Sequence, residues 1–329
     1  MKALVTGGNG FLGTEITRQL LALGHEVVSL SRKDAPHVRA LGATTVQGDV
    51  ADFNTVQGAA RGADAVFHVA AKAGIWGDRA DFERTNVTGT KAVIEACLRE
   101  GVKKLVYTSS PSVVAHGGDL SGVDERAPFP TRYIADYPRT KAIAEVLALS
   151  ANGPHLSTTA LRPHLIWGPG DAHILPRLVE RAKAGKLKLV GTGASLVDTT
   201  YIENAALAHI LAERSLGVGS ANAGKPYFIS NGEPLPVGEI VGRLVEAAGA
   251  PRPTKKVPFA IAYAVGAVSE AVYRLLHKSD EPLMTRFLAE ELATAHWFDI
   301  SAAKRDFGYV PAVSIDEGLR RLRASFAGG

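Results

Sequence analysis

The sequence predicts an α/β protein with a doubly wound parallel sheet and a smaller, mostly helical C-terminal lobe. Two observations predict this class. Short apolar runs alternate with helical patterns through the first half of the chain, which is typical of parallel strands joined by helices. The first of these runs leads directly into closely spaced glycines, as at a strand-to-helix turn that binds a ligand.

The N-terminal turn carries the clearest motif. The first expected strand, Lys2 to Thr6, runs into a helical pattern through a G-x-x-G-x-x-G turn made of Gly7, Gly10 and Gly13. Gly7 permits the sharp turn, Gly10 lets the backbone approach a pyrophosphate, and Gly13 allows close packing of helix on sheet. The phosphates would lie on the free N–H groups at the start of the helix. A glycine-rich turn without a ligand is the alternative, but the flanking strand and helix favour a Rossmann-type dinucleotide site.

The second expected strand, residues 26–30, indicates which dinucleotide is bound. A carboxylate at its tip would bind the ribose hydroxyls of NAD, whereas a neighbouring arginine accommodates the 2′-phosphate of NADP. The strand is followed by Ser31, Arg32 and Lys33, without a carboxylate. Arginine can bind a phosphate through two parallel hydrogen bonds, so we expect NADP(H). A solvated pair of surface cations is the alternative.

Four further strands are expected at 44–48, 65–69, 104–108 and 157–162, and they end at the same edge of the sheet. Asp49 follows the first of these, where its carboxylate either accepts from the adenine amino group or caps the next helix. Ligands of such sheets bind beyond the carboxyl ends of the strands. We therefore expect these residues to bind the cofactor: Gly7, Gly10, Phe11, Leu12, Gly13, Ser31, Arg32, Asp49, Val50, Ala70, Ala71, Lys72, Tyr137, Lys141 and Pro163.

Catalytic chemistry is indicated by Tyr137 and Lys141, which lie four residues apart at the start of an expected helix and so share one face. The strand 104–108 delivers Ser109 and Ser110 to the same sheet edge. A phenol with an ordinary pKa near ~10 is poorly matched to neutral pH, and a nearby ammonium lowers that pKa. We expect Tyr137 to protonate a ketone, Lys141 to activate it and bind the nicotinamide ribose, and Ser110 to stabilise the developing alkoxide.

The second half of the chain follows a looser pattern, and we place a domain boundary near Gly168. Residues 1–167 would form the NADP-binding domain with a return segment at 195–230, and 168–329 would form the substrate-binding lobe. Helices are expected at 174–184, 203–212, 237–248 and 258–276, with a last helix that starts in a capping box of Ser314 and Glu317.

The apolar stretch 257–276 has cations at both ends. It could be core, a dimer face, a wall for alkyl chains, or a helix on a membrane surface in contact with anionic lipid. Core or interface packing is the expectation. The charge-free part of the stretch, 257–269, has 13 residues and is too short to span a bilayer.

Composition excludes several classes of protein. The net charge of +4 over 329 residues comes without a basic stripe, so nucleic acid is not an expected partner. The single cysteine, Cys97, rules out an internal disulfide and is expected to pack in a helix. The ten histidines show no paired spacing of metal ligands, so no metal is expected. With no signal peptide and no transmembrane segment, a cytoplasmic protein is expected.

The quoted motifs resemble the extended short-chain dehydrogenase/reductase family. The glycine turn, Ser110, Tyr137 and Lys141 carry this resemblance, and residues 107–113 and 197–204 are similar to the family's 3β-hydroxysteroid dehydrogenase branch. Other segments resemble the bacterial 2-alkyl-3-oxoalkanoate reductases of long-chain olefin biosynthesis: 70–77, 161–171, 197–207, 227–236 and 306–310. Nearly the whole chain is covered.

The resemblance implies NADPH-dependent reduction of a 2-alkyl-3-oxoalkanoic acid to the 2-alkyl-3-hydroxy acid. It carries over Ser110, Tyr137 and Lys141 in the roles described above, although the serine assignment could shift to Ser109. It also implies a homodimer and partnership with a β-lactone synthetase and a β-lactone decarboxylase. A 3β-hydroxysteroid or sterol dehydrogenase is the alternative enzyme, and a non-catalytic NAD(P)-binding sensor is the alternative of another class.

A substrate with one carboxylate and two alkyl chains needs a cation and an apolar trough. Lys72, His164 and Arg177 are candidate anchors for the carboxylate, and each could equally be an ordinary surface or loop residue. Trp76 and Trp167 could line the trough, although a core position is the more usual one for tryptophan.

Overall fold

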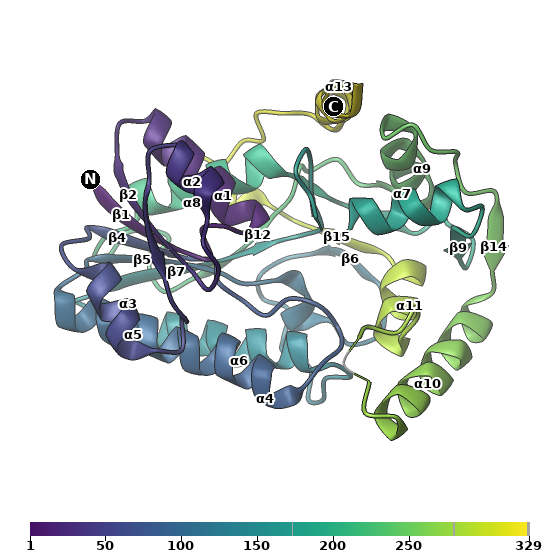
Figure 1. The fold of residues 1–329 in the computed structure, drawn as a ribbon, viewed down its shortest axis with the longest axis horizontal. Helices are drawn as coiled ribbons and strands as arrows, with labels where there is room; N and C mark the ends of the chain where they lie inside the picture. The colour runs from purple at the N-terminus through teal and green to yellow at the C-terminus, as the bar shows by residue number, and fades with distance from the viewer. Residues whose placement is uncertain (173, 279, 328–329) are drawn as a thin grey trace.

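The computed structural model describes residues 1–172, 174–278 and 280–327 of the chain. A seven-stranded sheet lies at its centre, with the strand order β12-β7-β5-β4-β1-β2-β3 (Figure 1). All neighbouring strands run parallel. The strands are β1 (Lys2–Thr6), β2 (Glu26–Ser31), β3 (Thr44–Gln47), β4 (Ala65–His68), β5 (Lys104–Thr108), β7 (Ser157–Pro163) and β12 (Pro226–Ile229).

The sheet is doubly wound, as predicted. From β1 the chain builds β2 and β3 on one side, then returns to build β4, β5, β7 and β12 on the other. The winding direction therefore reverses between β1 and β4. The carboxyl ends of these two strands flank the crevice in which open α/β sheets bind their ligands.

Helices cover both faces of the sheet (Figure 1). On one face lie α1 (Phe11–Ala22), α2 (Pro36–Ala40) and α8 (Ile202–Ser215), and on the other lie α3 (Phe53–Ala60), α5 (Gly89–Glu100) and α6 (Asp136–Ser150). Because both faces are covered, the central strands are buried throughout, and every residue of β7 is buried. This burial explains why the strands read as apolar runs and not as an alternation of apolar and polar residues.

The C-terminal lobe is helical and also contains short strands. Its helices are α7 (Leu175–Lys183), α9 (Val237–Ala247), α10 (Phe259–Leu275) and α11 (Arg286–Ala293). A four-stranded sheet contains β13 (Leu235–Pro236), β10 (Leu196–Val197), β15 (His296–Phe298) and β6 (Leu120–Val123). Because β6 comes from the first half of the chain and β15 from its end, this sheet joins the lobe to the nucleotide-binding half.

The remaining elements are short or lie near the C-terminus. They are α4 (Arg79–Phe82), a π-helical turn (Glu83–Thr88), a 3₁₀-helix (Pro111–Val114), the strand pairs β8 (Ile166–Trp167) with β11 (Thr200–Tyr201) and β9 (Lys188–Val190) with β14 (Lys255–Val257), and helices α12 (Ser301–Phe307) and α13 (Ile315–Ala327). Among the helices described, none is long and apolar enough to cross a membrane.

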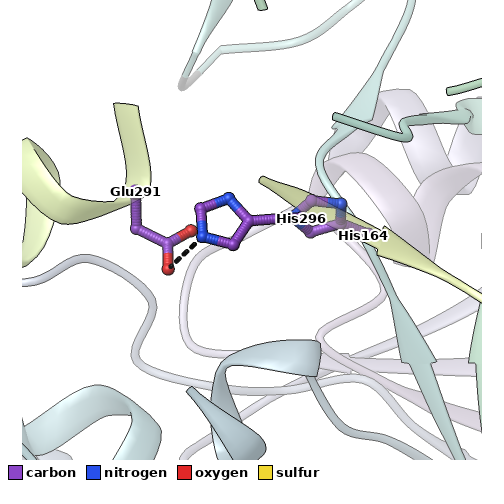
Figure 2. A group of neighbouring side chains, drawn as sticks. All are labelled: His164, Glu291 and His296. Carbon is purple, nitrogen blue, oxygen red and sulfur yellow. Dashed lines mark ion pairs between the residues drawn. The ribbon is translucent and has the colours of Figure 1, made fainter. Parts of the chain in front are cut away.

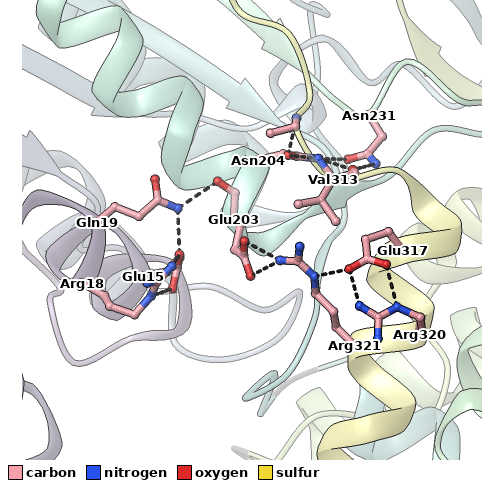
Figure 3. A network of polar contacts seen from close by, with 11 residues as sticks. Glu15, Arg18, Gln19, Glu203, Asn204, Asn231, Val313, Glu317, Arg320 and Arg321 are labelled. Atoms are coloured by element: carbon pink, nitrogen blue, oxygen red, sulfur yellow. Dashed lines mark hydrogen bonds and ion pairs between the residues drawn. The ribbon is translucent and has the colours of Figure 1, made fainter. Parts of the chain in front are cut away.

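A polar network holds the end of the chain against α8 (Figure 3). The Asn204 amide donates to the side-chain oxygen of Asn231 (2.9 Å) and to the carbonyl of Val313 (2.7 Å), while its own oxygen accepts from the Val313 N–H (3.0 Å). Arg321 of α13 also donates to Glu203 of α8 at 2.8 Å. A fully buried asparagine with its hydrogen bonds made fixes the chain leading into α13 in one position.

Candidate active site

The turn between β1 and α1 depends on backbone contacts that only glycine permits. Gly7 has a φ of +70°, and a Cβ at this residue would lie 2.8 Å from the backbone of Ala70. A Cβ on Gly13 would lie 2.2 Å from the carbonyl oxygen of Gly7. Gly13 therefore allows α1 to close onto the turn itself, where the sequence had suggested contact with the sheet.

The start of α1 fits the phosphates of a dinucleotide. Gly10 is the N-cap of α1. Because glycine has no side chain, no side-chain hydrogen bond caps the first turn of this helix. The first N–H groups of a helix lack partners within the helix and carry a positive partial charge. Phe11 is half-buried and Leu12 is buried at this end of the helix. Because α1 follows β1 directly, these N–H groups lie at the carboxyl end of β1, where a pyrophosphate finds its usual donors in such folds.

Residues at the ends of β2 and β3 take different positions. Ser31 is buried, and its hydroxyl donates to the carbonyl of Lys33 at 2.9 Å. Arg32 is exposed, and its guanidinium makes no hydrogen bond or ion pair within the residues described. Asp49 accepts from the N–H of Ala51 (2.8 Å) and pairs with Arg84 (2.6 Å). The helix-capping role considered for Asp49 belongs instead to Asp52, whereas the Asp49 carboxylate closes a local turn on Ala51.

The two serines after β5 have different surroundings. The Ser109 hydroxyl is buried and has no hydrogen-bond partner in the described part of the chain. Ser110 is half-buried and is the N-cap of the 3₁₀-helix, where its oxygen accepts from the Ser112 N–H at 3.2 Å. Its hydroxyl shares a hydrogen bond with the Ser112 hydroxyl at 2.9 Å and lies near enough to the Tyr137 phenol to lower the pKa of that phenol. Ser110, and not Ser109, is thus the serine that faces Tyr137.

Lys141 lies one turn after Tyr137 on α6, and only 2% of it is exposed. Its amine donates to the carbonyl of Thr108 at 2.5 Å and lies 4.2 Å from the centroid of the Tyr107 ring. Burial lowers the pKa of Lys141 to about 7, and the carboxylate of Glu145 raises it only in part. Glu145 itself accepts from Arg162 at 2.9 Å.

The Tyr137 phenol differs from the expectation. Burial raises its pKa, and the neighbouring Ser110 hydroxyl lowers it in part. The sequence had suggested a pKa depressed by the Lys141 ammonium, but the amine is held by the carbonyl of Thr108 and itself has a depressed pKa. A phenol with a raised pKa is protonated at neutral pH, and this is the form that a proton donor requires.

The segment after β4 packs against the glycine turn. The Ala70 N–H donates to the Thr6 hydroxyl at 3.2 Å, and Ala71 follows, half-buried. Lys72 donates its backbone N–H to the side-chain oxygen of Asn86 at 2.7 Å. Pro163, at the end of β7, is buried and pairs with Ile229 of β12.

Asn86 is a structural link that sequence reasoning missed. Its amide donates to the hydroxyl of Thr140 on α6 (3.0 Å) and to the carbonyl of Lys72 (3.2 Å). Asn86 therefore connects the segment after β4 to the helix that carries Tyr137. It lies in the π-helical turn, and a single asparagine within a helical pattern gave no signal of this role.

None of the three anchors considered for a substrate carboxylate is an available cation. Lys72 pairs with Asp81 at 2.7 Å, and Arg177 pairs with Glu281 at 3.1 Å. Burial lowers the pKa of His164 to about 3, so this ring is neutral. Of the two tryptophans, Trp167 is a core residue that donates to Thr199, whereas Trp76 is half-buried and donates to the carbonyl of Lys278.

A cavity of ≈ 80 Å³ is lined by Pro138, the residue that follows Tyr137 on α6. Tyr133, Pro138 and Ala115 line it from the nucleotide-binding half, and α11 and β15 line it from the lobe. Arg132 also lines it, and its guanidinium has no acidic partner within the residues described. The walls of the cavity thus come from both halves of the protein.

His164, Glu291 and His296 form a cluster at this junction (Figure 2). Their potential ligand atoms lie within 4.8 Å of one another, so the three side chains could hold a metal ion, which the sequence did not suggest. The cluster also has protein partners: His164 donates to the carbonyl of Asp198 at 2.6 Å, and His296 bonds to the Thr294 hydroxyl at 2.8 Å. No spacing motif predicts the cluster, because Glu291 and His164 are far apart in the sequence.

Comparison with known proteins identifies the relatives of this chain. Residues 4–259 match the 3-beta hydroxysteroid dehydrogenase/isomerase family. A 2-alkyl-3-oxoalkanoate reductase of Stenotrophomonas maltophilia is 53% identical over 99% of this chain and 100% of its own length. A second protein of that name, from Shewanella oneidensis, is 50% identical over 98% of this chain and 86% of its own length.

A solved structure supports the fold and the cofactor class. MoeE5, in complex with UDP-glucose and NAD, is 25% identical and superposes with a TM-score of 0.76 over 100% of this chain and 99% of its own. The likeness covers the nucleotide-binding half together with the lobe. The chain therefore belongs to the 3-beta hydroxysteroid dehydrogenase/isomerase family and is an NAD(P)-dependent oxidoreductase.

Proposed function

We propose that this protein reduces 2-alkyl-3-oxoalkanoic acids to 2-alkyl-3-hydroxyalkanoic acids with NADPH. The observation that carries the proposal is the Ser110 hydroxyl beside the Tyr137 phenol, one helical turn from the buried amine of Lys141. Two relatives that are 53% and 50% identical to this chain bear the name of that activity. The family match and these names support a ketoreductase, and the further details below belong to the proposal.

Tyr137 is the proton donor in this proposal. NADPH supplies the hydride to the carbonyl carbon, and the negative charge that develops on the oxygen requires a proton. The phenol is protonated at neutral pH because burial raises its pKa. Once the proton has left, the Ser110 hydroxyl donates to the phenolate, in accord with the direction in which Ser110 shifts the pKa of the phenol.

Lys141 restores the proton and binds the cofactor ribose. An amine with a pKa of about 7 gains and loses a proton near neutral pH, so Lys141 can pass a proton toward the phenol. Its present acceptor, the carbonyl of Thr108, lies at the end of β5 beside the crevice. The amine has three hydrogens, so it can donate to a ribose hydroxyl and keep its bond to β5.

Arg32 selects NADPH over NADH. It follows β2, the strand whose end meets the adenosine ribose in such folds. Its guanidinium is exposed and makes no hydrogen bond or ion pair in the described ranges, so it is available to a 2′-phosphate. The buried hydroxyl of Ser31 occupies the place where a carboxylate would repel that phosphate.

Arg132 is the cation that we propose for the substrate carboxylate, in place of the three anchors considered from the sequence. It lines the cavity beside Pro138, and no acidic group pairs with it in the described part of the chain. Glu290 and Glu291 line the same cavity from α11, and burial raises the pKa of both carboxyls. Burial thus disfavours the charged forms of these carboxyls, which would repel a bound carboxylate.

A 3β-hydroxysteroid dehydrogenase is the second candidate, because the family that matches residues 4–259 carries that description. The same three side chains would serve the oxidation. For the first candidate, the proposal extends to long-chain olefin biosynthesis in the cytoplasm, to a homodimer, and to partnership with a β-lactone synthetase and a β-lactone decarboxylase.

Replacement of Tyr137 by Phe tests the reaction. We expect kcat for oxidation of a 2-alkyl-3-hydroxy acid by NADP⁺ to fall about 10²–10⁴-fold, because the acid–base group is lost. The Kd of NADPH, measured by its fluorescence, should stay within about twofold of wild type. Tyr227→Phe is the matched control, since its hydroxyl bonds to Asp306 beside the edge strand β12.

The same assay separates the two candidate substrates. Turnover of the hydroxy acid but not of a 3β-hydroxysteroid supports the reductase. Turnover of the steroid alone would make the steroid dehydrogenase the better candidate. A Tyr137→Phe enzyme that keeps more than about a tenth of the wild-type kcat would contradict the assigned proton donor.

Replacement of Arg32 by Ala tests the choice of cofactor. Loss of charge-assisted hydrogen bonds to a phosphate costs about 1.5–3 kcal/mol, so the KM for NADPH should rise about 10- to 100-fold. The KM for NADH should not change. Arg61→Ala, at an exposed arginine after α3, serves as the control. Equal changes in the two KM values would show that Arg32 does not contact the 2′-phosphate.

Replacement of Lys141 by Met tests the burial of its amine. The pKa is lowered from 10.5 to about 7 on folding, so between these values the unfolded chain holds a proton that the folded protein has released. The free energy of unfolding therefore rises with pH in this window, by up to ~1.4 kcal/mol per pH unit from this group.

Urea unfolding of the cofactor-free protein at pH 7, 8 and 9 measures the effect. The wild type should gain stability relative to Lys141→Met as the pH rises, whereas Lys91→Met, at an exposed lysine on α5, should follow the wild type. Parallel pH profiles of the wild type and Lys141→Met would contradict the depressed pKa.

A further inference from the structure

Helix α10 presents an apolar face to solvent. It lies at the rim of the lobe, away from the central sheet, and packs mainly against α11 (Figure 1). Large apolar residues are exposed along its length and just after it: Phe259 (41%), Ile261 (55%), Val265 (50%), Val268 (64%), Val272 (44%), Leu275 (79%) and Leu276 (57%). Five of these, from Ile261 to Leu275, recur every three or four residues, so they form one stripe on the helix.

The opposite face of α10 is the one that joins the core. Ala262, Gly266 and Glu270 are buried there at a spacing of four residues. A Cβ on Gly266 would lie 2.6 Å from the backbone of Thr285, so the helix is held tightly on that side. The expectation that this stretch packs in the core therefore holds for one face only, and the apolar stripe faces away from it.

The charges around the stripe are cationic at both ends. Lys255 and Lys256 precede the helix, and Arg274 and Lys278 lie at its end, all of them exposed. The one acidic residue of the helix, Glu270, is buried and accepts from Arg286 at 2.7 Å. Two acidic residues follow the helix: Asp280, which is exposed, and Glu281, which pairs with Arg177.

We infer that the α10 stripe binds the surface of an anionic lipid bilayer, with the apolar residues among the acyl chains and the lysines and arginine at the headgroups. An apolar helix face bordered by cations is the arrangement that lies in the plane of such an interface. The proposal needs no membrane-spanning helix, since α10 lies flat on the bilayer.

A second copy of the chain fits this face less well. In a two-fold dimer the same patch contacts itself. Because both ends of the stripe carry cations, α10 packed on α10 in either direction would bring cations against cations. Anionic headgroups neutralise both ends at once.

The helix also contacts a segment of the candidate active site. Trp76, which follows the segment after β4, donates to the carbonyl of Lys278 at 3.1 Å and packs edge-on against Tyr273 at 6.1 Å. A bilayer on α10 would thus lie beside the entrance used by a substrate with two alkyl chains. That last step rests on the proposed function, whereas the membrane contact does not.

Co-sedimentation of the full chain with vesicles tests the inference. We expect binding to vesicles of equal parts phosphatidylglycerol and phosphatidylcholine, at least tenfold weaker binding to phosphatidylcholine alone, and a loss of affinity with added salt. Val268→Glu should weaken binding at least tenfold. Val310→Glu is the matched control, because Val310 is also 64% exposed and lies away from α10.

A variant with reversed charges tests the role of the cations, and the oligomeric state tests whether the stripe is instead a contact between copies of the chain. Lys255→Glu with Lys256→Glu should weaken binding to the anionic vesicles, whereas Arg61→Glu should not. Retained NADPH binding in each variant shows that it is folded. Failure of the wild type to sediment with anionic vesicles would overturn the inference. So would Val268→Glu if it splits a dimer in solution and leaves sedimentation unchanged, because the stripe would then be a contact between copies.

Discussion

The buried amine of Lys141 is the interaction on which the candidate active site depends. Its bond to the carbonyl of Thr108 joins α6 to the end of β5, the strand that delivers Ser110. Lys141 is almost fully buried, and the carboxylate that partly restores its pKa, Glu145, is bound to Arg162. A lysine in such surroundings costs stability, since burial disfavours its charged form. This cost falls at the place where the proposed reaction moves a proton near neutral pH.

In the proposed function, the catalytic residues and the substrate contacts come from different parts of the fold. The glycine turn follows β1 and Ser110 follows β5, so both lie at the carboxyl ends of strands in the parallel sheet. Helix α6 covers one face of that sheet, whose strands are covered on both faces. The cavity lined by Pro138 of α6 is completed by α11 and β15 of the lobe. Relatives that share the sheet edge can therefore share the reaction and differ in substrate, as the 3β-hydroxysteroid description of the family and the reductase names of two members indicate.

The sequence predicted the nucleotide-binding half well because its signals are local. Apolar runs marked the parallel strands, and G-x-x-G-x-x-G marked the turn, although Gly13 packs against the turn and not the sheet. The lobe was harder, because β10, β13 and β15 have two or three residues each and pair only through contacts distant in sequence. The positions of Asn86, Arg132 and the His164 cluster also depend on contacts between residues distant in sequence, so the sequence did not predict them. Of the capping box, the structure keeps one half: Ser314 accepts from the N–H of Glu317, whose carboxylate binds Arg320 and Arg321.

The most direct test of the account is a crystal structure of the protein with NADP⁺ and a 2-alkyl-3-hydroxy acid. We predict the Tyr137 oxygen within hydrogen-bond distance of the substrate hydroxyl, the Lys141 amine on the nicotinamide ribose, and the substrate carboxylate on Arg132. A Tyr137 oxygen directed away from the substrate hydroxyl, with another group in its place, would contradict the account.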